Sequence, residues 1–193
     1  MRRVLGVLVL VSVLGVVFAG CGGGSEGEGS APGSSPAPPP SSMVESTSTT
    51  TQSSSDEEAI LASVQGYWRA ILRANDPPDP EHPDLERYAT GDALERAVAN
   101  VKERRSLNRV IRLPAESQYR HMAQVETIVG DRATVIDCGV DDTLVIDVPS
   151  GVVLNNAVET TRWRTELVRV DDTWKVARNS VLEAWRGVDG CAL

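Results

Sequence analysis

The sequence lacks an excess of positive charge. Its 27 acidic residues outnumber its 19 basic ones, which gives a formal net charge of -8, and Lys102 and Lys175 are its only lysines. An acidic domain repels phosphate backbones and offers no basic cluster to anionic lipids. The composition therefore excludes nucleic acid as a partner and a polybasic membrane contact, and it favours a solvated surface or a cationic partner.

A run of apolar residues long enough to span a membrane is also missing. Val4 to Phe18 is an almost uninterrupted aliphatic stretch. As a helix it would cover about 22 Å of a hydrocarbon core that is ~30 Å thick. Arg2 and Arg3 precede it, and no charged stop-transfer flank follows. This pattern predicts an export signal over residues 1–20.

The chain has no phosphate-binding loop and little material for a metal site. Gly22 to Gly24 precedes a polar low-complexity segment, whereas a phosphate loop joins a strand to a helix. Cys138 and Cys191 lack the spacing of metal ligands. Two alternatives to a disulfide remain: both cysteines are free thiols, or they bind a metal together with His82 or His121. An even cysteine pair in an exported chain predicts a disulfide. We expect no metal and no cofactor.

The end of the apolar stretch carries the clearest motif. Phe18-Ala19-Gly20-Cys21 resembles the bacterial lipobox, with Phe18 at the usual leucine position. The resemblance implies cleavage before Cys21 and lipid on its sulfur, so that the protein would be held on the extracytoplasmic side of a bacterial cell membrane. Two or more acyl chains anchor stably, whereas one binds marginally. The alternative is an ordinary secretory signal cut near Ala19, which would leave a soluble protein.

Residues 21–55 are Gly, Ser, Pro, Thr and Glu with almost no apolar side chain. Such a segment cannot bury enough apolar surface to offset its ordering entropy, so it is predicted to be a disordered tether. Ser55 followed by Glu58 has the pattern of a capping box. The folded domain is therefore expected to begin with a helix and to cover residues 56–193.

The periodicity of residues 56–193 changes once. Helical spacing continues from residue 56 to about 74, a short turn is predicted at 85–89, and a further helix ends near Leu107. The charged face of that last helix, with Arg96 and Arg104, is predicted to be solvated. After Pro114 the period becomes two. Strands are predicted over residues 119–129, 133–140, 143–148, 159–170 and 174–185.

Helices followed by hairpin-linked strands predict an α+β fold, with N-terminal helices packed on a curved antiparallel sheet. One long helix lying across the sheet is expected to bury the apolar residues Trp68, Ile71, Trp163 and Trp174.

Two segments resemble the nuclear-transport-factor-2-like (NTF2-like) superfamily, which includes SnoaL-like cyclases and ketosteroid isomerase. They are the leading helix over 60–74, with its Tyr67-Trp68 pair, and the closing hairpin over 163–176, where Trp-Lys-Val follows a two-residue acidic turn. The resemblance covers residues 56–185 and implies a cone-shaped fold around a pocket. With the lipobox and the arginine-rich composition, the chain looks like actinobacterial lipoproteins that carry such a domain.

Enzymes of this superfamily place an Asp, His or Tyr in the pocket. The candidates here are His121, Asp137 and Tyr119, together with Arg178, which on the last strand could point inward and pair with Asp137. Each also has a structural interpretation, as a hydrogen-bonded core residue or an ion pair. No pair of residues matches a catalytic motif, so none is assigned as catalytic.

Three functions fit these observations. The first is a non-enzymatic tethered domain that binds an envelope protein or an apolar small molecule. The second is an accessory role beside an envelope transporter. The third is an extracytoplasmic isomerase, dehydratase or hydrolase that uses His121 with Asp137. The absence of a catalytic signature favours the first.

Overall fold

The computed structural model describes residues 49–191, with side chains from residue 54 onward. The predicted export signal, Cys21 and the tether as far as residue 48 lie outside the described residues. No helix within 49–191 is both long enough and apolar enough to cross a bilayer.

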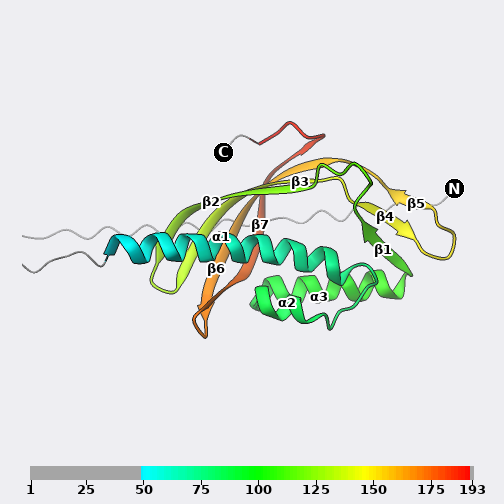
Figure 1. Ribbon diagram of the computed structural model, residues 1–193. Coiled ribbons are helices and arrows are strands. Elements are labelled where there is room, and N and C mark those ends of the chain that lie inside the picture. The colour runs from blue at the N-terminus through cyan, green and yellow to red at the C-terminus, as the bar shows by residue number, and fades with distance from the viewer. Residues whose placement is uncertain (1–48, 192–193) are drawn as a thin grey trace, which may run out of the picture. The chain divides into compact units, whose positions relative to one another are not determined.

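The chain forms its helices first and its strands afterwards (Figure 1). The helices are α1 (Thr49–Ala74), α2 (Pro83–Tyr88) and α3 (Gly91–Ser106). The strands are β1 (Arg109–Arg112), β2 (Arg120–Val129), β3 (Arg132–Asp141), β4 (Leu144–Asp147), β5 (Val153–Asn155), β6 (Glu159–Val170) and β7 (Thr173–Arg186). This order confirms the predicted α+β class.

The strands form two antiparallel sheets. The larger has the order β2-β3-β6-β7, and the smaller has the order β1-β4-β5. Asp171 and Asp172 both have positive φ, at 48° and 58°, as a two-residue hairpin turn between β6 and β7 requires. The sequence pattern missed β1 and β5, because strands of four and three residues are too short to show a period.

Bulges bend the larger sheet. They interrupt the register between Val125 and Thr127 in β2, and at two places between β6 and β7. A bulge adds a residue to one strand and increases the local twist. The long strands consequently curve over α1 (Figure 1). In β2 the extra residue also reverses the side-chain alternation, so that Val129, predicted to share a face with Val125, is 74% exposed.

The main core lies between α1 and the larger sheet. One face of α1 packs Ile60, Val64 and Tyr67 against buried side chains from the strands. Ser63 Oγ donates a hydrogen bond of 2.6 Å to the carbonyl oxygen of Trp174, which ties the helix to β7. The alanine side chains Ala70, Ala74 and Ala97 belong to a second cluster, and their small size brings the helices together.

Two expectations about α1 are wrong. The helix begins at Thr49, so Ser55 and Glu58 lie inside it and do not form a capping box at its start, and residues 49–55 are not part of a disordered tether. The expected burial is also incomplete. Trp174 is buried, but Trp68, Ile71 and Trp163 are half-buried, because part of each side chain borders a cavity.

Candidate functional site

Asp137 is a fully buried carboxylate in the middle of the larger sheet. Its Oδ2 accepts a hydrogen bond of 2.7 Å from Trp68 Nε1 on α1, and it lies 2.7 Å from Nδ1 of His121 on β2. Its other oxygen, Oδ1, has no partner in the described part of the chain. One carboxylate oxygen therefore joins the long helix to the edge strand of the sheet.

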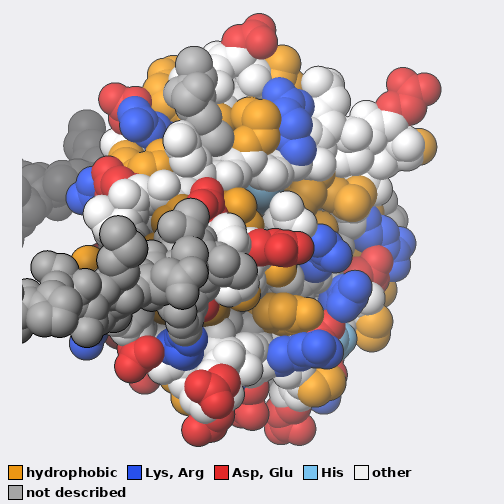
Figure 2. All heavy atoms as spheres, turned by 60° about the vertical axis from the view of Figure 1, so that its left-hand side comes forward, with side chains coloured by type: hydrophobic (Ala, Val, Ile, Leu, Met, Phe, Trp, Pro, Cys, Tyr) orange, Lys and Arg blue, Asp and Glu red, His pale blue; other side chains and the backbone are white. Residues whose placement is uncertain are grey.

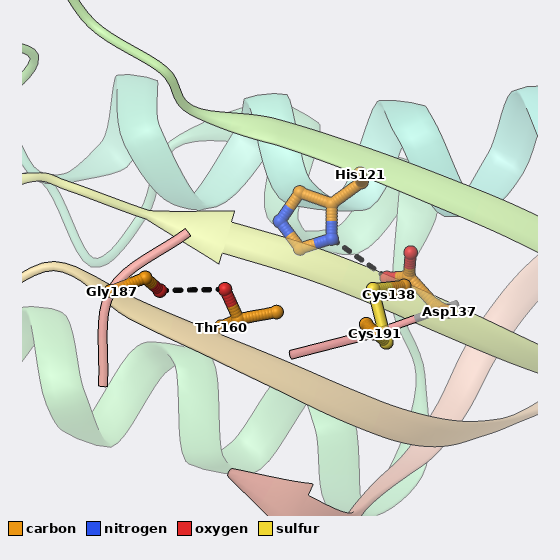
Figure 3. The surroundings of a disulfide bond; sticks show 6 residues. All are labelled: His121, Asp137, Cys138, Thr160, Gly187 and Cys191. Atoms are coloured by element: carbon orange, nitrogen blue, oxygen red, sulfur yellow. Dashed lines mark hydrogen bonds and ion pairs between the residues drawn. A yellow bond between two sulfur atoms is a disulfide. The ribbon is translucent and has the colours of Figure 1, made fainter. Parts of the chain in front are cut away.

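The strand register explains why His121 reaches Asp137. His121 is paired with Gly139, and Asp137 lies two residues before Gly139 on β3, so the three residues share one face of the sheet. A diagonal neighbour of this kind is within reach of a long side chain. Figure 3 shows the two side chains meeting from adjacent strands.

The imidazole of His121 is held from several sides. It stacks on the indole of Trp68, with ring centroids 4.2 Å apart and planes 13° from parallel. The Tyr119 ring meets it edge-on at 5.2 Å. Below it lies the bare backbone of Gly139, where an added Cβ would come within 2.5 Å of the ring carbon Cε1. Glycine is thus required for the ring to occupy this place.

Asp137 also selects the tautomer of a neutral His121. A carboxylate accepts hydrogen bonds, so a neutral ring placed against it carries its proton on Nδ1. The second ring nitrogen, Nε2, then presents a lone pair, and it points away from Asp137 in Figure 3. His121 lines an open cavity, and 8% of its side chain is exposed. The arrangement can accept a hydrogen bond or a proton from a bound molecule.

That cavity, here called the His121 cavity, has a volume of about 340 Å³. Its floor is formed by the inward-facing residues of β3, β6 and β7, and its walls by α1, β1 and the loops around β5. Aromatic and aliphatic side chains form most of the lining: Trp68, Ile71, Leu72, Ile111, Tyr119, Trp163 and Val181. The charged residues among those that line it in the described chain are Asp141 and Glu159, which are directly opposite each other on β3 and β6.

The structure brings together three of the four predicted pocket residues. Tyr119 joins His121 and Asp137, and burial raises the pKa of its phenol well above the usual value, with the carboxylates of Asp141 and Asp137 raising it further. The proton therefore stays on the Tyr119 oxygen at neutral pH.

The expected pair between Arg178 and Asp137 is wrong. Arg178 is more than half exposed, and its Nη2 lies 3.0 Å from the Asp92 carboxylate at the start of α3. The bulge between β6 and β7 is the reason: it places an extra residue after Val176, so that Asn179 takes the inward position that simple alternation gives to residue 178.

Two members of the site were missed by sequence reasoning. Trp68 was assigned only to the core, because its helical spacing is that of any buried apolar residue. Gly139 sits inside a strand, and an isolated glycine there is a signal of close approach by another group. That signal was present in the sequence, but it does not say which group approaches.

The predicted disulfide between Cys138 and Cys191 is confirmed. Successive residues of a strand face opposite sides, so Cys138 lies on the face of the sheet opposite to Asp137 and His121. The segment after β7 crosses this outer face, where the Thr160 hydroxyl donates a hydrogen bond of 2.7 Å to the Gly187 carbonyl (Figure 3). No cluster of metal-binding side chains occurs within the residues that the structure describes.

The outer surface offers no field of one sign on the face seen in Figure 2. Acidic and basic side chains are interspersed there, with hydrophobic side chains between them. This face therefore gives no reason to look for a polyanionic partner, and the His121 cavity remains the candidate site.

Comparison with known proteins identifies a fold but no family. No family model matches the sequence, and no curated protein matches it either. The intermembrane space region of the chloroplast protein ARC6 is a similar solved structure, with a TM-score of 0.52 and 21% identity over 66% of this chain and 96% of that one. At this identity the likeness shows the fold alone.

Two further solved structures are more distant. The Kfla4162 protein from Kribbella flavida has a TM-score of 0.47 and 15% identity, covering 69% of this chain and 95% of its own. An NTF2-like protein with a cystatin-like fold from Novosphingobium aromaticivorans has a TM-score of 0.41 and 18% identity, covering 77% of this chain and 94% of its own. The α+β class, with helices packed on a curved antiparallel sheet, is as predicted. These similarities do not bear on the lipid anchor or on an actinobacterial source.

Proposed function

We propose that this domain is a membrane-anchored binding protein for a small molecule that occupies the His121 cavity. The observation that carries the proposal is the cavity itself: about 340 Å³, open to solvent and lined by aromatic side chains around a fixed imidazole. Ligand sites in proteins begin at about this volume and combine apolar walls with a few placed polar groups.

The lining defines the chemistry of the ligand. Trp68, Trp163 and Tyr119 offer flat apolar surfaces, which suit a ring or a planar hydrocarbon. His121 Nε2 accepts a hydrogen bond from a hydroxyl or an amine. Asp141 and Glu159 favour a positive group, since like charges placed opposite each other across two strands repel. A planar apolar molecule with a protonated amine satisfies all three features, and one with a hydroxyl satisfies the first two.

Titration with 2-naphthol and 2-naphthylmethylamine tests this assignment. Both probes should bind saturably, and tryptophan fluorescence should report it, because Trp68 and Trp163 line the cavity. His121→Ala should weaken both probes, and Glu159→Gln should weaken the amine alone. Glu166→Gln, an exposed carboxylate on the same strand, is the matched control and should change neither. Binding of neither probe, or equal binding by all four proteins, would overturn the proposal.

The membrane location rests on the N-terminal sequence, whose resemblance to a lipobox supports lipid on Cys21. Two acyl chains on that sulfur would hold the domain stably at a membrane surface. Cell fractionation tests this: the wild-type protein should sediment with membranes and incorporate labelled palmitate. Cys21→Ala should lose the label and move to the medium or accumulate as a precursor. A wild-type protein found in the cytosol with its first twenty residues intact would overturn the location.

A second candidate function is proton transfer, and the His121–Asp137 pair favours it. A buried carboxylate that orients an imidazole is the arrangement by which a general base is positioned. The base would remove a proton from a carbon beside a carbonyl group of a ligand in the cavity. Exchange of that proton into heavy water should be accelerated by the wild-type protein and lost in His121→Gln. Equal exchange by both proteins, or none by either, would leave binding as the function.

A further inference from the structure

A second cavity of about 240 Å³ lies between α1 and α3, and it is called here the arginine cavity. It shares Trp68, Ile71, Ile111 and Trp163 with the His121 cavity, so these four side chains border both. The remaining lining is different in kind: Tyr67, Asn75, Ala93, Arg96, Ala97, Asn100, Arg104 and Asn179. The two cavities are adjacent but carry opposite charges.

Helix geometry explains how the basic residues reach this place. Arg96, Asn100 and Arg104 are four residues apart, so they form one stripe on α3 that is about 12 Å long. Tyr67, Ile71 and Asn75 form a stripe of the same spacing on and just after α1. Both arginines line the cavity. Arg96 is exposed, as predicted for the charged face of α3, but Arg104 is half-buried, so the prediction is wrong for that residue.

Neither of these two guanidinium groups has a carboxylate partner within ion-pair distance among the described residues. No carboxylate belongs to the lining of the cavity in that part of the chain either. Burial lowers the pKa of Arg104, and this loss of water outweighs the opposite effect of the more distant carboxylates of Glu103 and Asp141. An anion in the cavity would give Arg104 the close partner that it lacks.

Unpartnered buried atoms mark the same cavity. Asn75 is 2% exposed, and its Oδ1 has no hydrogen-bond partner in the described part of the chain. Arg104 Nε and Asn179 Nδ2 are buried donors in the same condition. Buried polar groups are nearly always paired, because leaving one unpaired costs about 1–3 kcal/mol. A polar molecule bound in this cavity would supply partners for such atoms.

We propose that the arginine cavity binds a small aromatic carboxylate. Arg104 and Arg96 would bind the carboxylate group, since a guanidinium matches its two oxygens in geometry and charge. Trp68, Ile71 and Trp163 contact the ring, and Asn75 Oδ1 accepts a hydrogen bond from a ring hydroxyl. The groups that would recognise the carboxylate and the hydroxyl lie on α3 and at the end of α1, outside the lining of the His121 cavity, although the side chains that contact the ring border both cavities.

Isothermal titration calorimetry of the full folded domain tests the site with 3-hydroxybenzoate, benzoate and benzamide. The two carboxylates should bind, with 3-hydroxybenzoate tighter than benzoate, and benzamide at least tenfold weaker because it lacks the charge. Arg104→Gln should weaken benzoate at least tenfold, and Arg96→Gln provides a second variant if the first fails to fold. Arg105→Gln, an exposed arginine on the same helix, is the matched control and should bind as the wild type does.

Two results would overturn the assignment. One is benzoate binding that is unchanged in both Arg96→Gln and Arg104→Gln. The other is sulfate binding as tightly as benzoate, which would indicate a site for inorganic anions. Glu159→Gln separates this proposal from the previous one. It changes a residue of the His121 cavity alone, so it should weaken the amine probe and leave the benzoate affinity unchanged.

Discussion

Gly139→Ala is expected to destabilise the domain through one contact. The added Cβ would come within 2.5 Å of Cε1, 2.8 Å of Nδ1 and 3.2 Å of Nε2 of His121. The ring cannot yield without cost, because Trp68 stacks on it at 4.2 Å. Accommodation of the methyl group therefore moves the imidazole away from Asp137 and from the indole.

The size of the effect follows from the contacts that are lost. A hydrogen bond to a charged group contributes about 1.5–3 kcal/mol to stability. An aromatic pair contributes about 0.5–1.5 kcal/mol beyond its buried area. Replacing glycine by alanine inside a strand returns up to about 1 kcal/mol of backbone entropy. We expect Gly139→Ala to lower the free energy of unfolding by about 2–3 kcal/mol.

A double-mutant cycle isolates the cause. In a His121→Ala background the methyl group meets no ring, so Gly139→Ala should change the free energy of unfolding by less than about 1 kcal/mol. Urea unfolding of the four proteins, followed by circular dichroism under non-reducing conditions, measures the coupling. Equal costs of Gly139→Ala with and without His121 would refute the argument that the imidazole requires this glycine.

Three further outcomes are expected. Cys138→Ser removes the disulfide to Cys191, which is 53 residues away, and should lower the free energy of unfolding in urea by about 4 kcal/mol. An unchanged urea midpoint would contradict this. Arg178→Ala should cost less than about 1 kcal/mol and leave probe binding intact, since its pair with Asp92 is exposed; a larger loss would assign it a role at the site. Burial raises the pKa of Tyr119, so the folded state holds the phenol proton more tightly than the unfolded state does. The free energy of unfolding should therefore fall as the pH rises above the unfolded pKa of about 10. Tyrosinate absorbance that appears at the same pH in folded and unfolded protein would refute this.

The candidate site was predicted in part. Period-two patterning placed His121 and Asp137 on neighbouring strands, and the register brings them together. The same pattern failed for Arg178, because a bulge adds one residue and reverses the face of everything beyond it. Bulges have no clear signature in a single sequence. Alternation therefore predicts which residues of a strand point inward only as far as the first bulge in that strand.

The sequence by itself determined the class of the fold, the long strands and the cysteine pair, because periodicity, turn residues and cysteine number are local or countable properties. Only the tertiary structure decided that Trp68 donates to Asp137, 69 residues away, and that Trp68 and Trp163 border cavities instead of filling a core. It also decided that Arg96 and Arg104 of α3 line a cavity. An apolar stripe has the same residue spacing whether its side chains pack in a core or line a cavity. Which of the two occurs depends on how far apart the facing helix and sheet are held, and the sequence spacing does not show that distance.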